Sequence, residues 1–428
     1  MNRPLILAAS IAFAGAGCVH FTAQPLDPSR SAAALSGRRL SSKTWTLRAL
    51  REEAARNSPD VAVARAQYET AKAAVRTAGE RPNPTIALAP QIVTPFKAWQ
   101  AGTYPVDFDW TFETAGKRSK RLDTARASVN AAAAHVIDAE WKARVAVRKA
   151  LLELYAAEQR GKLIGDAIAK QGDLLKSLDD RVKAGAEART ALAQPRLLQA
   201  QLRLQAADAA KGASLARASL AEALAMGTSG LAGATFSFAP FEGVPGKRTA
   251  HRREALTHRA DVIEALANYA AAESTLRLEI AKQYPDIHLN PGYSFDQNEN
   301  KWTLGIGLTL PILNHNQGAI GEADGKRKEA EAKFNAVQAK VLADCNRAAA
   351  AVAAARAKIA TTDEMIAEQD KQLASEQRMV AAGEGDKLAL LSAQVERATI
   401  LTARLDALVE LQAALGALEE ATQAPLEK

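Results

Sequence analysis

The chain is 428 residues long, 48% apolar, 24% charged and only 5% aromatic. An ordinary globular core of this size would hold more aromatic side chains, whereas this heavy use of alanine favours long helices that pack closely. The formal charge of +7 is weak evidence for a nucleic-acid partner. Acids and bases alternate along the sequence, which indicates solvated helix faces with ion pairs one turn apart.

The first residues are typical of a secretory signal. A charged start at Arg3 precedes an apolar run that is too short to span a bilayer, and small residues lead up to Cys18. We therefore expect residues 1–17 to be a signal peptide. Cys18 stands where bacterial lipoproteins carry an acylated cysteine, so we expect a covalent lipid on it; the alternative is a plain signal peptide with an incidental cysteine. Cys345 would then have no disulfide partner.

Residues 18–44 are rich in proline, serine, alanine and arginine and show no periodicity. We expect them to form an extended segment between the anchor and the fold. Helical spacing of leucine and alanine then covers residues 46–80, where Thr46 can cap the helix. The dipeptide Ser58-Pro59 suggests a break near the start of this helix.

Two runs of alternating apolar and polar residues follow, at about 85–94 and 104–112. They predict a pair of antiparallel strands. Residues 114–184 contain no proline and predict one long helix. At about 1.5 Å per residue such a helix extends on the order of 100 Å. After a turn at Gly185, a shorter helix returns to about residue 226.

The glycine- and proline-rich residues 227–250 are the clearest break in the chain. We expect a linker there between two structural repeats, 45–226 and 251–421. The second repeat follows the order of the first and ends in a short tail at 422–428. Its predicted elements are a helix at 251–284, strands at about 286–296 and 301–310, a long helix at 317–382 and a returning helix at 386–421.

The spacing of the two repeats supports a duplication. The motif Pro-x-Ile-x-Leu opens the first strand of each repeat. The stretch of chain from Phe112 to Gly185 has the same length as the stretch from Leu310 to Gly383. Helices of equal length that begin at one level also end at one level. We therefore expect the turns at Gly185 and Gly383 to lie together.

Each predicted strand has one apolar face and one face of polar or small residues. In strands of about ten residues this pattern is typical of a transmembrane barrel wall. Judged on the strands alone, two half-buried hairpins of a soluble α+β domain are the alternative. Only four such strands are predicted, isolated hairpins are marginal, and every strand edge in lipid must be paired. Several copies of the chain must then contribute to one barrel.

The order of helix, strand pair, long helix and returning helix, found twice behind a signal and Cys18, resembles the TolC-type outer-membrane efflux factors. The turns at residues 182–185 and 379–384 and the Leu-Leu-Ser-Ala-Gln run at 390–394 are similar to the helix tips of that family. Residues 112–118, Phe-Glu-Thr-Ala-Gly-Lys-Arg, resemble the junction of strand and helix in the heavy-metal branch, which serves exporters of cobalt, zinc, cadmium, nickel and copper.

The resemblance implies a mainly α-helical fold with a small transmembrane β part. Three copies would form a homotrimer with a twelve-stranded β-barrel in the outer membrane, continued through the periplasm by an α-helical barrel. It implies a passive exit duct, neither enzyme nor cofactor-dependent, that works with a periplasmic adaptor (membrane fusion protein) and an inner-membrane pump of the resistance-nodulation-division type. Heavy-metal cations are the expected cargo. Drug efflux, type I protein secretion, or a different role as a periplasmic helical adaptor are the alternatives.

The resemblance also assigns functional positions. It places the docking of adaptor and pump at the periplasmic tips, and it places the channel constriction at Ser392, where the family often has an aspartate. The tip residues that it singles out are Gly185, Glu187, Gly383, Glu384 and Asp386.

Motifs for catalysis or metal binding are missing from the sequence, which contains no phosphate loop, HExxH or CxxC. His315 stands where a strand turns into a helix, and a capping turn is favoured there over a metal ligand. His251 and His258 are close enough in sequence to share one helix, but neighbouring arginines would repel a cation. Four basic residues begin the first long helix, and they are either solvated or in contact with lipid headgroups or acidic neighbours. They are Lys117, Arg118, Lys120 and Arg121.

Overall fold

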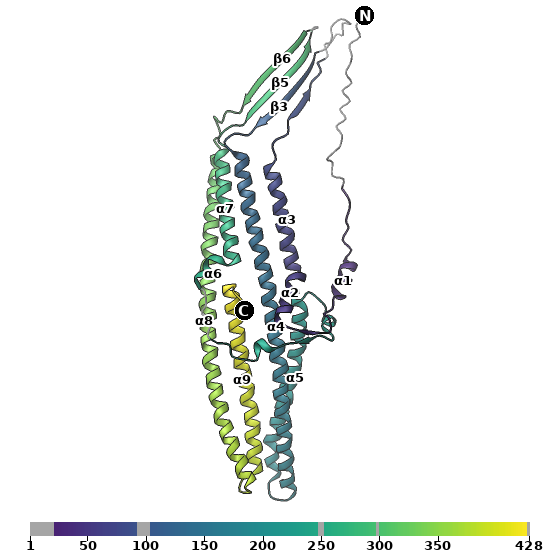
Figure 1. Cartoon of the computed structure of the whole chain (residues 1–428), viewed down its shortest axis with the longest axis vertical. Coiled ribbons are helices and arrows are strands. Elements are labelled where there is room, and N and C mark those ends of the chain that lie inside the picture. The colour runs from purple at the N-terminus through teal and green to yellow at the C-terminus, as the bar shows by residue number, and fades with distance from the viewer. Residues whose placement is uncertain (1–20, 92–102, 247–251, 297–298, 426–428) are drawn as a thin grey trace.

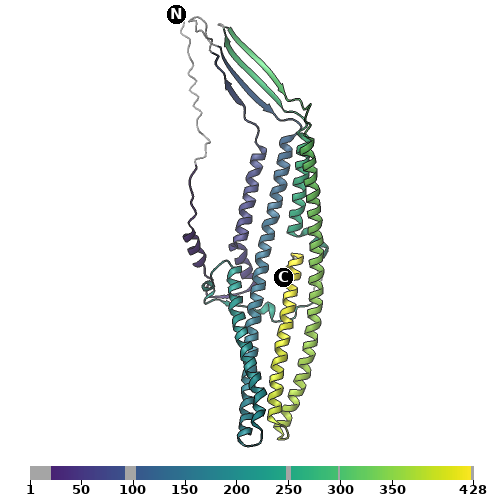
Figure 2. The same ribbon diagram turned by 180° about the vertical axis from the view of Figure 1, so that it is seen from behind.

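The protein is a long, narrow bundle of helices with a small sheet at one end. The computed structural model describes residues 21–91, 103–246, 252–296 and 299–425. Figure 1 shows the sheet at the top, two helix-to-helix turns at the bottom, and the C-terminus at mid-height. The same chain seen from behind has its helices side by side in a curved wall (Figure 2).

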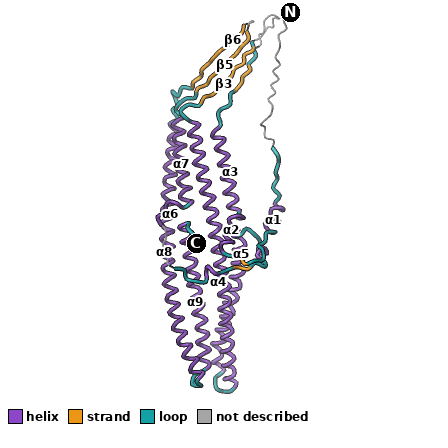
Figure 3. The backbone as a smooth tube through the Cα atoms, viewed as in Figure 1, coloured by secondary structure: helices purple, strands orange, loops and turns teal. Residues whose placement is uncertain are grey.

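The duplicated order predicted from the sequence is confirmed. The first repeat contains α2 (Leu47–Asn57), α3 (Pro59–Gly79), β2 (Thr85–Leu88), β3 (Tyr104–Phe112), α4 (Lys117–Lys183) and α5 (Ala193–Ala223). The second contains α6 (Arg252–His258), α7 (Ala260–Ala281), β5 (Ile287–Asp296), β6 (Glu299–Leu308), α8 (Gln317–Ala381) and α9 (Lys387–Thr422). Figure 3 shows that helix dominates both repeats and that the strands are confined to one end, apart from a short pair at mid-height.

The helix that opens each repeat is broken once. In the first repeat the break is at Ser58, as Ser58-Pro59 predicted, because its backbone is extended with ψ 127°. The single helix predicted at 251–284 is wrong: it breaks at Arg259, where ψ is 144°. The Arg259 side chain there donates to Ala421 O of α9 at 2.7 Å, a long-range contact, and also binds the nearby Asp261, and both contacts hold the extended residue.

The long helices begin where the backbone leaves the left-handed region. Ala115 and Gly116 have φ of 52° and 66°, and Asn316 has φ of 61°. Helix α4 therefore begins at Lys117 rather than at residue 114, while α8 begins at Gln317 as predicted. The two helices contain 67 and 65 residues, so the two repeats are close to equal in length but not identical.

The two helical hairpins, α4 with α5 and α8 with α9, are packed in the same register. Gln171 of α4 donates to Pro195 O at 2.8 Å, and Gln369 of α8 donates to Ala393 O at 3.1 Å. Both glutamines are buried, and they precede the tip glycines of their repeats by the same stretch of chain. Positions equally distant from Gly185 and Gly383 are therefore structurally equivalent in the two hairpins.

Helix α4 is the centre of the bundle. It packs against α3 and α5 of its own repeat and against α7 and α9 of the second repeat. Helix α8 packs against α6, α7 and α9. Within the described part of the chain, no helix of the first repeat packs along α8, so its remaining flank is open at the edge of the wall (Figure 1).

The four long strands form one sheet in the order β2-β3-β5-β6, with every neighbouring pair antiparallel. Both predicted strand pairs are confirmed, and the two repeats are joined through β3 and β5. Strand β2 ends at Leu88, although a bridge between Gln91 and Thr103 prolongs its pairing with β3. The rest of the first predicted strand, after residue 91, lies outside the described residues.

Two segments expected to be irregular contain ordered structure. The lead expected to be extended contains α1 (Pro28–Ser36), since Asp27 accepts hydrogen bonds from Ser29 N and Arg30 N and Pro28 starts the helix. The expected linker is an ordered belt across the middle of the bundle, which we define as residues 227–246. Its strand β4 (Thr235–Phe236) pairs in parallel with β1 (Thr44–Trp45).

The belt helps to build the largest hydrophobic core of the molecule. Phe241, Leu50, Leu151 and Leu220 have no exposed surface and pack in one cluster with Leu405 of α9. The belt is therefore part of the fold rather than a spacer between repeats.

A buried polar network lies beside this core. Arg51 Nη2 binds Glu419 Oε2 at 2.9 Å, and Gln412 Nε2 donates to Gly243 O of the belt at 3.0 Å. Arg148 Nη2 donates to Gln412 O at 3.2 Å. These bonds join α2, α4 and the belt to α9, and so tie the first repeat to the second.

Candidate functional site

The turns at Gly185 and Gly383 have the same geometry. Their φ angles are 73° and 78°, in the region that glycine adopts without steric cost. In the first turn Ala186 N donates to Arg181 O at 2.9 Å, and in the second Glu384 N donates to Met379 O at 3.0 Å. These bonds satisfy the last carbonyls of α4 and α8 in the pattern of a Schellman cap.

The two turns lie together at the end of the bundle farthest from the sheet (Figure 1). An ion pair connects them, since Arg181 Nη2 lies 2.6 Å from Asp386 Oδ1. Asp386 also caps α9 by accepting a hydrogen bond from Leu388 N at 2.9 Å. That bond, with the Arg181 guanidinium beside it, lowers the pKa of the Asp386 carboxyl despite the opposing effect of partial burial. Asp386 thus has a structural part in the tip.

The other predicted tip residues are exposed. Glu187 and Glu384 lie in the two turns with their side chains in solvent. Gly385, which the sequence analysis missed, is the equivalent of Glu187 in the second repeat. A Cβ at Gly385 would lie 2.6 Å from Val380 N, so only glycine fits the second turn. In the sequence, the second glycine of the Gly-Glu-Gly run at 383–385 could have indicated that the backbone packs closely at Gly385.

Ser392 lies in the second turn of α9 and is exposed in the single chain, while its neighbour Leu391 is buried. The roles assigned to Ser392 and to the tip residues stay predictions, because no partner is present.

The sheet has one apolar and one polar face, as the alternation of residues predicted. Across the four strands the register pairs Ile86 with Phe108, Val106 with Tyr293, and Tyr293 with Trp302. This apolar face is open in the single chain: Trp302 is 80% exposed and Ile306 72%. Its other large members are Leu88, Trp110, Phe112, Ile287, Leu304 and Leu308, all at least 42% exposed.

The opposite face is polar. His288 Nδ1 lies 3.1 Å from Asp109 Oδ1 and 3.2 Å from Thr111 Oγ1. Glycines opposite the polar side chains leave room for them: a Cβ at Gly292 would lie 2.4 Å from Asp107 Oδ1. Among the described residues, no group of three or more His, Cys, Asp and Glu is arranged to hold a metal ion.

Both edges of the sheet are unpaired within the described chain. Strand β2 pairs only with β3, and β6 pairs only with β5, so each leaves backbone donors and acceptors free along one side. None of the described helices has a stretch long and apolar enough to cross a membrane.

The basic cluster at the start of α4 contacts acidic neighbours, as one of the sequence alternatives expected, because Lys117 binds Asp286 and Arg121 binds Glu113. It also binds backbone carbonyl groups, which the sequence analysis did not predict. Lys117 Nζ donates to Tyr284 O and binds Asp286 Oδ1, both at 2.7 Å. Arg118 Nε donates to Gly79 O at 2.6 Å, and Arg121 donates to the carbonyls of Ala78 and Glu80. The cations therefore compensate the negative ends of α3 and α7.

At the corresponding junction of the second repeat, where α8 begins beside the end of α7, a side-chain amide takes the place of the basic residues. Asn316 Nδ2 donates to Glu279 O at 2.8 Å, near the end of α7. His315 is exposed, and its backbone N–H donates to Gln317 Oε1 at 2.9 Å, which agrees with a capping turn. His258 is exposed, and His251, like the lipid-anchor candidate Cys18, lies outside the described residues.

Residues 252–422 match the family model "Outer membrane efflux protein". The match spans the second repeat, from α6 to α9. The chain is also 27% identical over 225 residues to the cobalt-zinc-cadmium resistance protein CzcC of Cupriavidus metallidurans. That match covers 51% of this chain and 53% of CzcC, so the chain spans about half the length of this curated relative.

Solved outer-membrane channels have the same fold. The outer-membrane channel OprN superposes with a TM-score of 0.74 at 16% identity, covering 89% of this chain and 90% of OprN. VceC from Vibrio cholerae gives 0.71 at 20% identity, covering 89% and 97%. CusC gives 0.72 at 16%, covering 88% and 91%. The fold expected from the resemblance to the outer-membrane efflux factors is therefore confirmed.

Proposed function

We propose that this protein is the outer-membrane exit duct of a tripartite efflux complex and that it works as a homotrimer. The observation that carries the proposal is the four-stranded sheet, with an exposed apolar face and two open edges, at the far end of the bundle from the paired tips. A sheet with these properties suits lipid only if its edges are closed by other copies. Three copies would supply a twelve-stranded barrel, with the helices continuing it into the periplasm.

The remaining assignments rest on the sequence and on the resemblance to the efflux factors. Residues 1–17 would be removed and Cys18 acylated, so that residues 18–44 connect the lipid anchor to the repeats at 45–226 and 251–421. Gly185, Glu187, Gly383, Glu384 and Asp386 would meet the adaptor and a pump of the resistance-nodulation-division type, and Ser392 would line the constriction. The name of CzcC favours heavy-metal cations as cargo. Drug efflux and type I protein secretion are the alternative cargo classes.

The barrel is tested by placing a charge on each face of the sheet. Ile306→Arg puts a cation on the apolar face, where an arginine at the bilayer midplane costs about 2–4 kcal/mol, whereas Asn290→Arg puts it on the polar face. We expect Ile306→Arg to abolish recovery of detergent-stable trimer from the outer membrane and Asn290→Arg to preserve it. Native mass measurement and membrane fractionation give the readout. A stable wild-type monomer, or equal tolerance of both variants, would refute the barrel.

A further inference from the structure

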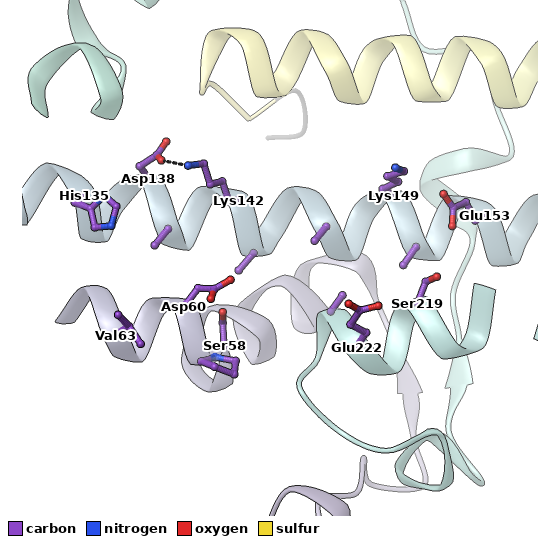
Figure 4. A pocket seen from close by; sticks show the side chains of 16 residues that line it. Ser58, Asp60, Val63, His135, Asp138, Lys142, Lys149, Glu153, Ser219 and Glu222 are labelled. Atoms are coloured by element: carbon purple, nitrogen blue, oxygen red, sulfur yellow. Dashed lines mark ion pairs between the residues drawn. The ribbon is translucent and has the colours of Figure 1, made fainter. Parts of the chain in front are cut away.

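The two faces of the helical wall can be told apart at the start of α4. Lys117 binds Asp286 at 2.7 Å and lies with His288 in a groove where the polar face of the sheet meets the helices. His135 follows Lys117 by about five full turns of helix and therefore points the same way. Figure 4 shows His135 with Lys142 in a groove of about 700 Å³ that is lined by α3, α4 and α5. That groove accordingly opens on the side of the polar face.

Another groove between α3 and α4 opens on the opposite side. It has a volume of about 650 Å³, and we define it, as the outer groove, by Lys72 and Arg76 of α3 and Arg126 of α4. Arg126 lies about two and a half turns from both Lys117 and His135, so it points away from the polar face. The outer groove is therefore on the side of the wall that continues the exposed apolar face of the sheet.

The outer groove lies just below the sheet. Arg76 is in the last turn of α3, which ends at Gly79. The chain then enters β2, whose apolar side chains Ile86 and Leu88 are 57% and 69% exposed. In the outer-membrane orientation proposed above, these side chains would face acyl chains, and the phosphate groups of the inner leaflet would lie at the level of the helix end. Arginine side chains are long enough to reach such groups from the last helical turn.

The outer groove has an excess of positive charge. Glu69 binds Lys72 at 2.9 Å, and Asp123 lies 3.6 Å from Arg126. Arg76, which lies between these two pairs, forms no ion pair with any described residue. An anion that entered the groove would therefore find an arginine that no carboxylate occupies.

Arg81 and Arg118 extend the positive charge to the end of α3. Both are exposed, and Arg118 Nε donates to Gly79 O at 2.6 Å. Within the described ranges neither forms an ion pair, and the exposed Glu80 is the acid next to them in the sequence. Like charges at one helix end repel one another and attract an anion.

The fold does not require this charge, because the second repeat reverses part of it. Counted from the prolines of the shared Pro-x-Ile-x-Leu motif, Lys72 corresponds to Glu273 and Arg76 to Arg277. Glu273 binds Arg277 at 2.6 Å. The arginine that lacks a partner in the first repeat is thus neutralised in the second by the residue that stands in place of Lys72.

Arg126 is replaced in the same way. Counted from the tip glycines, its equivalent is Asp324 of α8, which binds Arg327 at 3.0 Å and Lys328 at 2.7 Å. Two of the three cationic positions of the outer groove therefore hold acids in the second repeat. Since the fold accepts either charge, the positive charge of the outer groove points to a ligand.

We propose that the outer groove binds the phosphate group of an anionic phospholipid in the inner leaflet of the outer membrane. Arg76 and Arg126 would hold the phosphate oxygens, because a guanidinium presents a planar fork of donors to them. Ala73, Val75 and Val129 line the same groove and would contact the glycerol and the first carbons of the acyl chains. A homotrimer would have three such sites. The inference rests on the membrane orientation proposed above and names the lipid class that this orientation brings to the groove.

The site is tested by native mass measurement of lipid uptake by the full-length protein in a non-ionic detergent. Phosphatidylglycerol is the anionic probe, and phosphatidylcholine is the zwitterionic control. Lys72→Glu combined with Arg126→Asp gives the outer groove the charges that the second repeat already carries. Arg76→Gln removes only the unpaired charge. Arg277→Gln, at the equivalent position of the second repeat, is the matched control.

We expect each wild-type trimer to take up three phosphatidylglycerol molecules in preference to phosphatidylcholine. Arg76→Gln should weaken this uptake about fivefold, and the double variant, which loses two cations, about 25-fold or more. Arg277→Gln should leave it unchanged. The mass of the trimer and the midpoint of thermal unfolding show that each variant is folded, and Arg76→Gln carries the test if the double variant does not assemble.

The alternatives give different results. Equal uptake of both lipids by a wild-type trimer, or the same loss in Arg277→Gln as in Arg76→Gln, would overturn the site and leave the duct intact. Inorganic phosphate that displaced phosphatidylglycerol at equal concentration would overturn lipid recognition in favour of a free-phosphate site. A wild-type protein that is monomeric and absent from the outer membrane would refute the proposed function, and the lipid site with it.

Discussion

Gly185 and Gly383 determine how the two helical hairpins turn. Each adopts a positive φ, and at neither would a Cβ meet another atom within 4 Å. The need for glycine at these positions is therefore conformational. Two other residues of the tip act differently. Asp386 contributes through hydrogen bonds and charge, whereas Gly385 is needed because the backbone of α8 leaves no room for a Cβ there.

Replacing Gly185 or Gly383 by valine should strain the turn by about 1–2 kcal/mol, the cost of a left-handed conformation for an ordinary residue. Under the proposed function, adaptor docking and efflux should fall together. Ala184→Val is the matched control, since Ala184 has φ of −76° in the same turn. Copurification with the adaptor and cargo accumulation, compared at equal protein abundance, check this. Normal docking by both glycine variants would contradict a docking role for the tips.

The Asp386 carboxylate should stabilise the tip in a pH-dependent way. Its pKa in the folded protein is lowered, so its contribution is present above the unfolded pKa of about 3.9 and is lost as the pH falls through the folded value. Asn at 386 keeps the cap but removes the charge. We expect Asp386→Asn to lower stability by about 0.2–1 kcal/mol at neutral pH, as for an exposed ion pair.

The effect of Asp386→Asn should vanish in acid. Thermal unfolding of both proteins between neutral pH and pH values below about 4 gives the comparison. A difference that persists unchanged below that range would mean that the charge of Asp386 is not what stabilises the tip.

At the scale of elements, the belt and the break at Arg259 make contacts between residues far apart in the sequence. The belt lies against α2, α4, α5 and α9, and the break at Arg259 places a guanidinium on the last turn of α9. Both features depend on contacts between residues far apart in the sequence. The helices themselves depend mostly on local composition and periodicity.

Gly230→Ala should destabilise the belt. A Cβ at Gly230 would lie 2.4 Å from the backbone oxygen of Arg38, so the lead or the belt must move. Overpacking of this kind costs about 1–3 kcal/mol. Gly243→Ala, in the same belt but with nothing within 4 Å of the new Cβ, is the control. A lower midpoint of thermal unfolding for Gly230→Ala alone is expected. Equal midpoints would show that the belt yields without cost.

The sequence predicted what is local and periodic. The alternation of apolar and polar residues correctly predicted the two faces of the sheet. The equal distances in sequence from Phe112 to Gly185 and from Leu310 to Gly383 correctly predicted that the two turns lie together. The break at Arg259 was missed because nothing near it, unlike Pro59, interrupts a helix; its cause is a carbonyl at Ala421. For the basic cluster the acidic partners were among the expected alternatives, but the carbonyls were not, since they belong to the ends of α3 and α7. The start of α1 could have been predicted, because Asp27 followed by Pro28 is typical of a helix N-terminus.

The two ends of the whole molecule differ: one end has a sheet with an exposed apolar face and open edges, and the other has two turns with charged residues. If cargo passes through a duct formed by several copies, we expect the duct to be passive toward the metal. The polar face of the sheet has His288 beside Asp109, and His315 lies exposed in the turn before α8, where its backbone N–H donates to Gln317.

His288→Ala and His315→Ala should therefore leave metal export near the wild-type level. The comparison needs cells that carry the cognate pump, with intracellular metal measured at matched protein levels, and a Gly383→Val strain as the positive control for lost efflux. If one histidine variant stopped the export of one metal but spared another, the passive duct would be replaced by a channel with a selective metal site.

The shared register of Gln171 and Gln369 limits how this protein can change length. Each glutamine fixes one hairpin limb against the other. Deleting one residue from a limb would slide everything beyond by about 1.5 Å and rotate it by about 100°. The length of a helical hairpin can therefore change only when both of its helices lose or gain matching segments. A duct with level tips requires the same change in the other hairpin. In proteins that descend from this one, insertions and deletions within these helices should therefore occur together in all four of them, α4, α5, α8 and α9.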